Sequence, residues 1–143
     1  MGGSVTKLSD TLAAYFATQA PAGVVAAYLF GSHARNVAHA ESDVDVGVVA
    51  DYRTLPDRTE RGRLALRLAS DLIAVTHRNE VDVVVLNDAS PELAAHVLCR
   101  GRSLFCGDAA ADQAFVRATL LRYADLRPFL TRTRRLKLQA LMR

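Results

Sequence analysis

Hydrophobic residues follow two kinds of pattern along this chain, one with helical spacing and one of short apolar runs. Residues 5–19 and 57–78 place apolar side chains every three or four positions, which is the spacing of an amphipathic helix. Short runs rich in valine, leucine and phenylalanine are typical of strands. Such runs predict strands at 24–30, 43–49, 81–86 and 102–105.

Three further segments have helical character. Residues 91–99 follow Ser90 and have a proline in their first turn, a position that proline favours in helices. Residues 112–125 have apolar side chains in line along one helix face, and Pro128 is predicted to kink or restart that helix. Residues 32–38 are predicted to form a short helix that begins directly after a strand.

These elements predict an α/β (α+β) fold, with a small mixed sheet flanked by helices. A length of 143 residues fits one domain, 1–143. Residues 111–143 are predicted to be a basic C-terminal helical segment, because they hold eight Lys and Arg against two Asp. The segment therefore carries +6 in a chain of net charge +3, and the rest carries −3. Such a segment suggests an acidic partner or RNA, or equally a solvated helix face.

Composition narrows the class of protein further. No apolar run approaches the ~20 residues that span a bilayer, and the N-terminus lacks the pattern of a secretory signal. Cys99 and Cys106 are the only cysteines, and they form neither a disulfide framework nor a C-x-x-C pair. We therefore expect a cytoplasmic protein with reduced thiols and no association with a membrane.

Two aspartates lie two residues apart in the second predicted strand. Because successive side chains of a strand alternate between faces, Asp43 and Asp45 point the same way. Like charges held close together are unfavourable unless a cation lies between them. Mg²⁺ prefers carboxylate and phosphate oxygens, so the pair indicates a magnesium site, the alternative being two acids that face solvent.

A third aspartate lies in the next predicted strand. Asp82 is surrounded by valine and leucine in residues 81–86, so we expect the strand to be buried. A buried carboxylate is costly unless it is paired or bound to a metal. Asp82 is therefore predicted to be a third metal ligand beside Asp43 and Asp45. The alternatives are an ion pair with an arginine or a position at an edge that faces water.

Gly31 and Ser32 follow the first predicted strand, where a helix is predicted to begin. Glycine lets the backbone approach a ligand closely, and a helix N-terminus offers free N–H groups to phosphate. Arg35 follows one helical turn later and either contacts the same phosphates or pairs with an acid. Ser42, before Asp43, either orients that carboxylate or caps a turn.

Together these residues predict a site for displacement at a phosphate. Phosphate would be held at Gly31 and Ser32, and the three aspartates would hold two Mg²⁺ ions. Such a site activates an attacking hydroxyl and stabilises the pyrophosphate that leaves. Asp82 is predicted to accept the proton of the attacking hydroxyl as well.

The arrangement of these residues resembles a known superfamily. Gly31-Ser32, ten further residues, Asp43-Val44-Asp45 and the later Asp82 resemble the signature of DNA polymerase β-like nucleotidyltransferases. The short chain is similar to the minimal nucleotidyltransferases, the MNT group. Residues 123–130 and the basic helical segment that follows are similar to the MntA-type antitoxins.

The resemblance implies more than the residues indicate by themselves. Antitoxins of this type pair with a HEPN-domain ribonuclease toxin of the HepT type. They use ATP and Mg²⁺ to transfer AMP to a tyrosine of the toxin, which neutralises it. The resemblance therefore implies a protein adenylyltransferase that forms a hetero-oligomer with its toxin and does not bind DNA directly. It implies Asp43, Asp45 and Asp82 as catalytic metal ligands, and Gly31, Ser32, Arg35 and Ser42 as nucleotide contacts.

Two other functions remain open on the sequence. One is transfer of a nucleotide to a small molecule, although enzymes of that kind usually carry an additional acceptor domain. The other is an antitoxin that masks its toxin by binding alone, against which the three aspartates speak. No residue is assigned to the nucleotide base, since Phe115 and Tyr123 are predicted to be core residues and His96 to be incidental.

Overall fold

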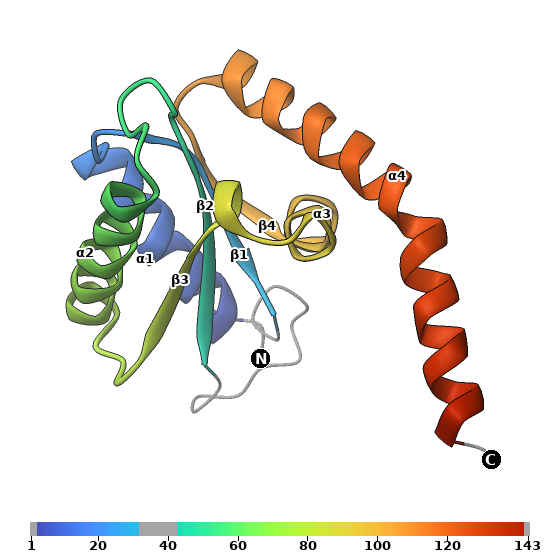
Figure 1. Cartoon of the computed structure of the whole chain (residues 1–143). Helices are drawn as coiled ribbons and strands as arrows, with labels where there is room; N and C mark the ends of the chain where they lie inside the picture. Colours follow the sequence, from blue (N-terminus) through green and yellow to red (C-terminus); the bar gives the residue numbers. More distant parts are fainter. Residues whose placement is uncertain (1–2, 32–42, 142–143) are drawn as a thin grey trace.

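The computed structural model describes residues 3–31 and 43–141, with side chains described for 7–31 and 43–126 (Figure 1). The strands are β1 (Val24–Phe30), β2 (Val44–Ala50), β3 (Val81–Val85) and β4 (Arg102–Cys106). The helices are α1 (Gly3–Gln19), α2 (Arg58–Thr76), the 3-10 turn η1 (Leu86–Asp88), α3 (Pro91–Arg100) and α4 (Ala109–Leu141). The mixed fold and all four predicted strands are confirmed.

The four strands form one mixed sheet in the order β3-β2-β1-β4. β1 is antiparallel to both β2 and β4, whereas β2 and β3 are parallel. One end of the sheet therefore contains the last residues of β1 and the first residues of β2 and β3. The residues predicted to carry the chemistry lie in the sequence at these strand ends.

Helices cover both faces of the sheet (Figure 1). On one face, α1 and α2 bury leucines and Phe16 against alternate residues of the strands, such as Leu29 and Val46. On the other face, α3 and the first part of α4 pack against the intervening residues, among them Tyr28 and Val49. The alternation of side chains along each strand thus divides the core into two layers.

The helix ends follow local sequence signals. Asp57 caps α2 by accepting a hydrogen bond from the Thr59 N–H, and His77 ends that helix in a left-handed conformation with φ of 56°. Ser90 caps α3 by accepting a bond from the Leu93 N–H, with the predicted proline in the first turn. These caps explain why both predicted helices begin within one or two residues of the expected positions.

A buried ion pair fastens the start of α2 to the turn that follows β3. The guanidinium of Arg61, only 6% exposed, donates to both carboxylate oxygens of Asp88 at 2.9 and 3.0 Å. A third bond runs from Arg61 Nη1 to the Leu55 carbonyl at 2.9 Å, and the Tyr52 ring lies over the guanidinium. The hydrogen bonds to Asp88 raise the pKa of Arg61, so its charge is retained.

A second polar contact attaches α4 to the sheet. The Tyr28 hydroxyl, on β1, donates to the Asp112 carboxylate at 2.7 and 2.8 Å. Burial raises the pKa of Tyr28 above its usual range, and the bond to Asp112 raises it further. Because Asp112 lies in the first turn of α4, this contact sets where the helix starts on the sheet.

Of the two alternatives expected at Pro128, a kink or a restart of the helix, the structure favours the kink. α4 continues as one helix through Pro128, so the chain does not restart there, although Figure 1 shows its course bending. A proline inside a helix removes one backbone hydrogen bond and commonly kinks the helix without ending it. The short helix predicted at 32–38 falls outside the described residues.

None of the helices that the structure describes is long and apolar enough to cross a membrane.

We predict that Asp88→Asn destabilises the fold by about 3 kcal/mol, because it leaves the buried Arg61 guanidinium without a counter-charge. Urea unfolding followed by circular dichroism measures this change. The matched control is Glu80→Gln, an exposed acid, which should change stability by no more than about 0.5 kcal/mol. Equal stabilities of the two variants would contradict the assigned role of the ion pair.

We predict that Tyr28→Phe costs about 1.5 kcal/mol at pH 7, since a hydrogen bond to a charged acceptor is lost. The raised pKa means that the folded state holds the phenol proton more tightly than the unfolded chain does. The contribution of the Tyr28 hydroxyl to the free energy of unfolding is therefore complete below pH ~10 and is lost as pH rises above that value. Urea unfolding at pH 7 and pH 11 should show the gap between wild type and variant narrowing at the higher pH. A gap that widens would contradict this assignment.

Candidate active site

Two of the predicted aspartates lie side by side at one end of the sheet. In the parallel pairing of β2 with β3, Asp45 is directly opposite Asp82. Directly opposite residues point to the same face of a sheet, so the two carboxylates share one face. Asp45 is also opposite Phe30, the last residue of β1. The carboxylates therefore lie where β1 ends and where β2 and β3 begin.

Gly31, directly after β1, contacts the carboxylate of Asp45. Its φ of +78° is a conformation that residues with side chains rarely adopt. A Cβ atom added at this position would lie only 2.7 Å from Asp45 Oδ2. Both the backbone conformation and the limited space require glycine at this position. Glycine therefore allows the turn after β1 to lie close to the Asp45 carboxylate.

The end of the sheet that holds these acids is not covered by α3. Asp45 and Gly47 point to the same face because they are two residues apart on β2. A Cβ atom on Gly47 would lie 3.0 Å from Val97 of α3 and 3.1 Å from Leu86, so α3 packs directly on this glycine. Asp45 lies one step beyond it and is half-buried. α3 thus forms a wall beside the acids.

Asp43 precedes β2 and is exposed. It lies two residues before Asp45, so the same alternation would bring its side chain to the same face. Among the residues with described side chains, however, no three acidic, histidine or cysteine groups lie together closely enough to hold a metal ion. The structure therefore brings Asp45 and Asp82 together as neighbours and leaves Asp43 at the open rim.

The expected burial of Asp82 is wrong. Asp82 is exposed, because β3 is an edge strand that pairs with β2 alone. The apolar residues around it are shared between two layers: Val81 and Val85 pack under α2, and Val84 packs on the other face. Its register with Asp45, rather than burial, is the structural reason to group the two carboxylates.

Three of the predicted nucleotide contacts, Ser32, Arg35 and Ser42, lie outside the described residues. Gly31 and the three aspartates are the part of the predicted site that the structure describes. Two or three carboxylates on one face, beside a glycine turn, are suited to bind a hard cation together with a polyphosphate.

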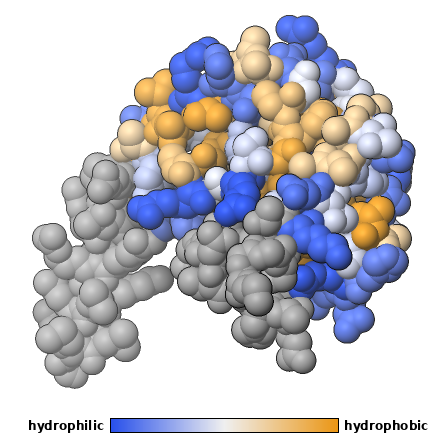
Figure 2. Space-filling model, turned by 180° about the vertical axis from the view of Figure 1, so that it is seen from behind, coloured by the Kyte–Doolittle hydropathy of each residue, from blue (hydrophilic) through white to orange (hydrophobic). Residues whose placement is uncertain are grey.

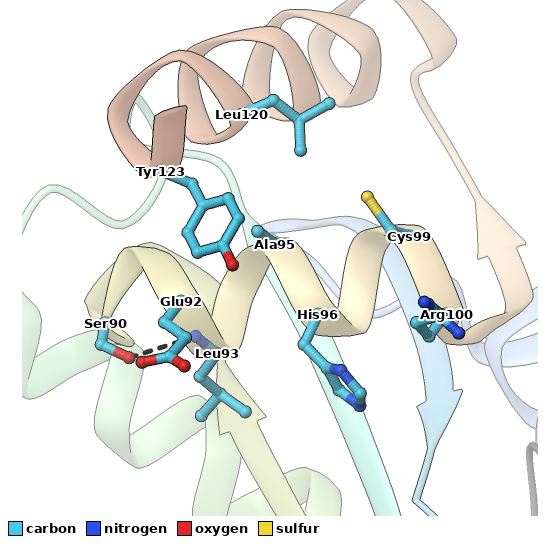
Figure 3. Close-up of a pocket in the computed structure, with 9 residues that line it drawn as sticks. All are labelled: Ser90, Glu92, Leu93, Ala95, His96, Cys99, Arg100, Leu120 and Tyr123. Atoms are coloured by element: carbon cyan, nitrogen blue, oxygen red, sulfur yellow. Dashed lines mark hydrogen bonds between the residues drawn. The ribbon is translucent and has the colours of Figure 1, made fainter. Parts of the chain in front are cut away.

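Sequence reasoning missed a groove on the side of the sheet that α3 covers. The groove lies between α3 and α4, has a volume of about 590 Å³ and is lined by His96 and Tyr123 among other residues (Figure 3). His96 is exposed, and Tyr123 is half-buried at the groove instead of lying in the core as predicted. The two residues lie on different helices, so no local sequence pattern joins them.

Comparison with known proteins gives matches over most of the chain. The model of the family described as polymerase beta, nucleotidyltransferase, matches residues 10–110. A protein of Shewanella oneidensis strain MR-1 named protein adenylyltransferase MntA is 37% identical over 99 residues. The matched part is 69% of this chain and 66% of that protein, so the chain matches just under two thirds of its length.

Solved structures agree with this fold. A chain of a toxin–antitoxin crystal structure with AMP-PNP superposes with a TM-score of 0.64 at 24% identity, over 94% of this chain and 98% of that one. A second structure is of a tri-AMPylated Shewanella oneidensis HEPN toxin in complex with an MNT antitoxin. One of its chains has a TM-score of 0.61 at 25% identity, over 96% of this chain and 98% of that one.

The matched range contains the whole set of elements that builds the acid site. It runs from within α1 to the start of α4, and it includes Gly31 together with all three aspartates. The match extends over well more than half of the chain. This protein therefore belongs to the polymerase beta nucleotidyltransferase family.

Proposed function

We propose that this protein is a protein adenylyltransferase that transfers AMP from ATP to a tyrosine of a HEPN ribonuclease toxin, and so acts as an antitoxin. The observation that carries the proposal is the pairing of Asp45 with Asp82 against the Gly31 turn. That arrangement supplies negative oxygen ligands next to a glycine turn, which transfer of a nucleotide requires.

The relatives support this choice among the reactions of the family. The relative that shares 37% identity is named as a protein adenylyltransferase. The neighbour at 25% identity was solved as an MNT antitoxin with an AMPylated HEPN toxin. We extend both descriptions to this chain.

Mg²⁺ fits the donor set of the site. Carboxylate oxygens on neighbouring strands are ligands that this ion prefers, and the exposed positions of Asp43 and Asp82 leave space for water and phosphate oxygens. We propose that Asp45 and Asp82 are ligands and that Asp43 completes the set when the nucleotide binds. When bound, Mg²⁺ would neutralise charge on the triphosphate and on the departing pyrophosphate.

The residues of this chain would then position the reactants. The tyrosine hydroxyl oxygen of the toxin attacks the α-phosphorus of ATP, and the bond from that phosphorus to the bridging oxygen breaks. Pyrophosphate leaves with the bonding electrons, and the hydroxyl proton passes to the Asp82 carboxylate. The Gly31 backbone lies against the Asp45 carboxylate, and we propose that Ser32, Arg35 and Ser42 contact the phosphates.

We propose that the protein works in the cytoplasm as a hetero-oligomer with its toxin. Cys99 and Cys106 are both free and exposed. The side of α4 that faces away from the sheet between residues 109 and 126 offers an exposed surface for such a partner, and we propose that the basic segment 111–143 takes part in binding it. Figure 2 shows hydrophobic surface on the face opposite to that of Figure 1, in patches broken by hydrophilic residues.

An antitoxin that masks the toxin by contact alone is the second candidate. Masking requires a surface that binds the toxin, but it does not require the carboxylates at the end of the sheet. Substitution of the aspartates therefore separates the two functions.

We predict that Asp45→Asn and Asp82→Asn each lower AMP transfer at least about a hundredfold, because each removes charge that faces the metal and the phosphates. The measurement is the mass gain of the co-purified toxin after incubation with ATP and Mg²⁺. Asp10→Asn, which changes an exposed acid of α1, is the matched control and should retain full transfer. Toxin neutralisation that survives the loss of transfer would support masking and refute the catalytic proposal.

We predict that Gly31→Ala lowers AMP transfer on the order of ten- to a hundredfold without unfolding the domain. The added methyl group would meet the Asp45 carboxylate and strain the backbone at positive φ, so the acid is displaced while its charge remains.

The control for this variant is Gly62→Ala, at a helical position where no atom lies within 4 Å of the added carbon. It should leave transfer unchanged and stabilise α2 by about 0.5–1 kcal/mol. Equal transfer by the two alanine variants, measured by the same mass gain, would show that the close approach of Gly31 to Asp45 is not needed.

A further inference from the structure

A hollow of about 580 Å³ lies at the end of the sheet opposite to the acids, and this volume is within the range of sites that bind small molecules. Val49 and Ala50, the last residues of β2, line it. Ala50 is five residues or roughly 17 Å from Asp45 along the strand. Figure 1 shows α4 starting at this end of the sheet, whereas β1 ends at the other. The hollow is therefore separate from the candidate active site.

Most of the lining of this hollow is apolar. Val25 and Val49 come from the sheet and Phe115 from α4, and all three belong to the apolar layer on that face of the sheet. Three alanines on one face of α4 continue the lining: Ala111, Ala114 and Ala118. Because these side chains are small, they leave space between the helix and the end of β2 that larger side chains would fill.

The polar groups of the hollow are held in place by contacts of their own. The Ala50 N–H donates to Asn87 Oδ1 at 2.8 Å, and Asn87 Nδ2 donates to the Ala50 carbonyl at 2.9 Å. The Tyr52 ring is 5.2 Å from the Arg61 guanidinium, which in turn is paired with Asp88. These contacts form the site in advance, so a ligand that binds there orders few further groups.

Two arginines from different elements give the hollow its positive charge. Arg53 follows β2 and Arg122 lies on α4, and both side chains are exposed. Neither guanidinium forms an ion pair with another described residue. Asp51 is the one acid among the described lining residues, and its carboxylate accepts bonds from the Arg53 N–H at 2.9 Å and the Thr54 hydroxyl at 3.1 Å. The two guanidinium groups are therefore available to an anion from solvent.

An apolar lining with cations at its rim fits a ligand that combines the same two properties. We propose that the hollow between β2 and α4 is a second binding site, for a small anion with a flat apolar body, such as an aromatic carboxylate or sulfonate. Phe115 and the three alanines contact the apolar body, and Arg53 and Arg122 attract the anionic group. This inference does not depend on the proposed function, because no residue of the hollow belongs to the acid site.

The test is a fluorescence titration of the purified full chain with 8-anilinonaphthalene-1-sulfonate, which has aromatic rings and one sulfonate. Its emission rises when it leaves water for an apolar site, so saturable binding is expected. N-phenyl-1-naphthylamine has the same rings without the sulfonate. Arg122→Gln should raise the Kd of the sulfonate about fivefold, the size of an exposed charged contact, and leave the Kd of the neutral probe within about twofold.

Ala114→Leu tests whether the probes lie in the hollow. The larger side chain fills the space and should raise the Kd of both probes at least about tenfold. Because Ala114 is an exposed helical position and leucine favours helices, the variant should fold like the wild type, which circular dichroism checks. Arg117→Gln and Ala124→Leu make the same changes at exposed positions of α4 outside the hollow, and neither should change either Kd.

Three results would overturn the proposal. The first is no saturable binding of the sulfonate to the wild type, and the second is equal binding of it by wild type, Arg122→Gln and Ala114→Leu. The third is loss of a co-purifying toxin from Ala114→Leu but not from Ala124→Leu, which would identify the hollow as a surface for a protein partner. Weaker binding of both probes to Ala114→Leu, with the toxin retained, supports the site for a small anion.

Discussion

The parallel register between β2 and β3 is the constraint on which the site depends. Asp45 is opposite Asp82 because Val44 pairs with Val81 and the pairing continues residue by residue along both strands. A slip by one residue would turn the side chain of Asp82 to the face covered by α2 and expose valines in its place. The buried valines of β2 and β3 therefore fix the positions of the carboxylates through the hydrophobic energy of the core, far more strongly than the carboxylates themselves could.

The crossover that joins these two strands supports the same register. Parallel strands cannot be joined by a tight turn, and α2 makes the connection here. The ion pair of Arg61 with Asp88 ties the first turn of that helix to the residues directly after β3, so the beginning of the connection is held beside the last residues of that strand. Asp88 lies six residues beyond Asp82, at the opposite end of β3. The stability of the site is thus controlled partly from a position that no substrate would contact.

The sequence predicted the elements well because each depends on local signals. Apolar spacing defined α1 and α2, Ser90 with its following proline defined the start of α3, and the spacing from Gly31 to Asp45 indicated the site. What it could not predict is the order of strands, which depends on contacts between distant segments. The edge position of β3, and with it the exposure of Asp82, follows from that order. The groove was missed for the same reason, since its walls come from α3 and α4 and form only when α4 packs across α3.

The exposure of Asp82 also changes how the charges of the site are understood. Two carboxylates on directly opposite residues repel each other, and in a buried strand that repulsion would be severe. At an edge strand and a half-buried position, water reduces this repulsion. The same openness admits a triphosphate and an acceptor side chain from solvent. Gly31 and Gly47 mark the limits of this opening: one lets the chain turn against Asp45, and the other lets α3 close over the sheet one step short of it. A larger side chain at either position would displace a wall of the site without altering a single charge.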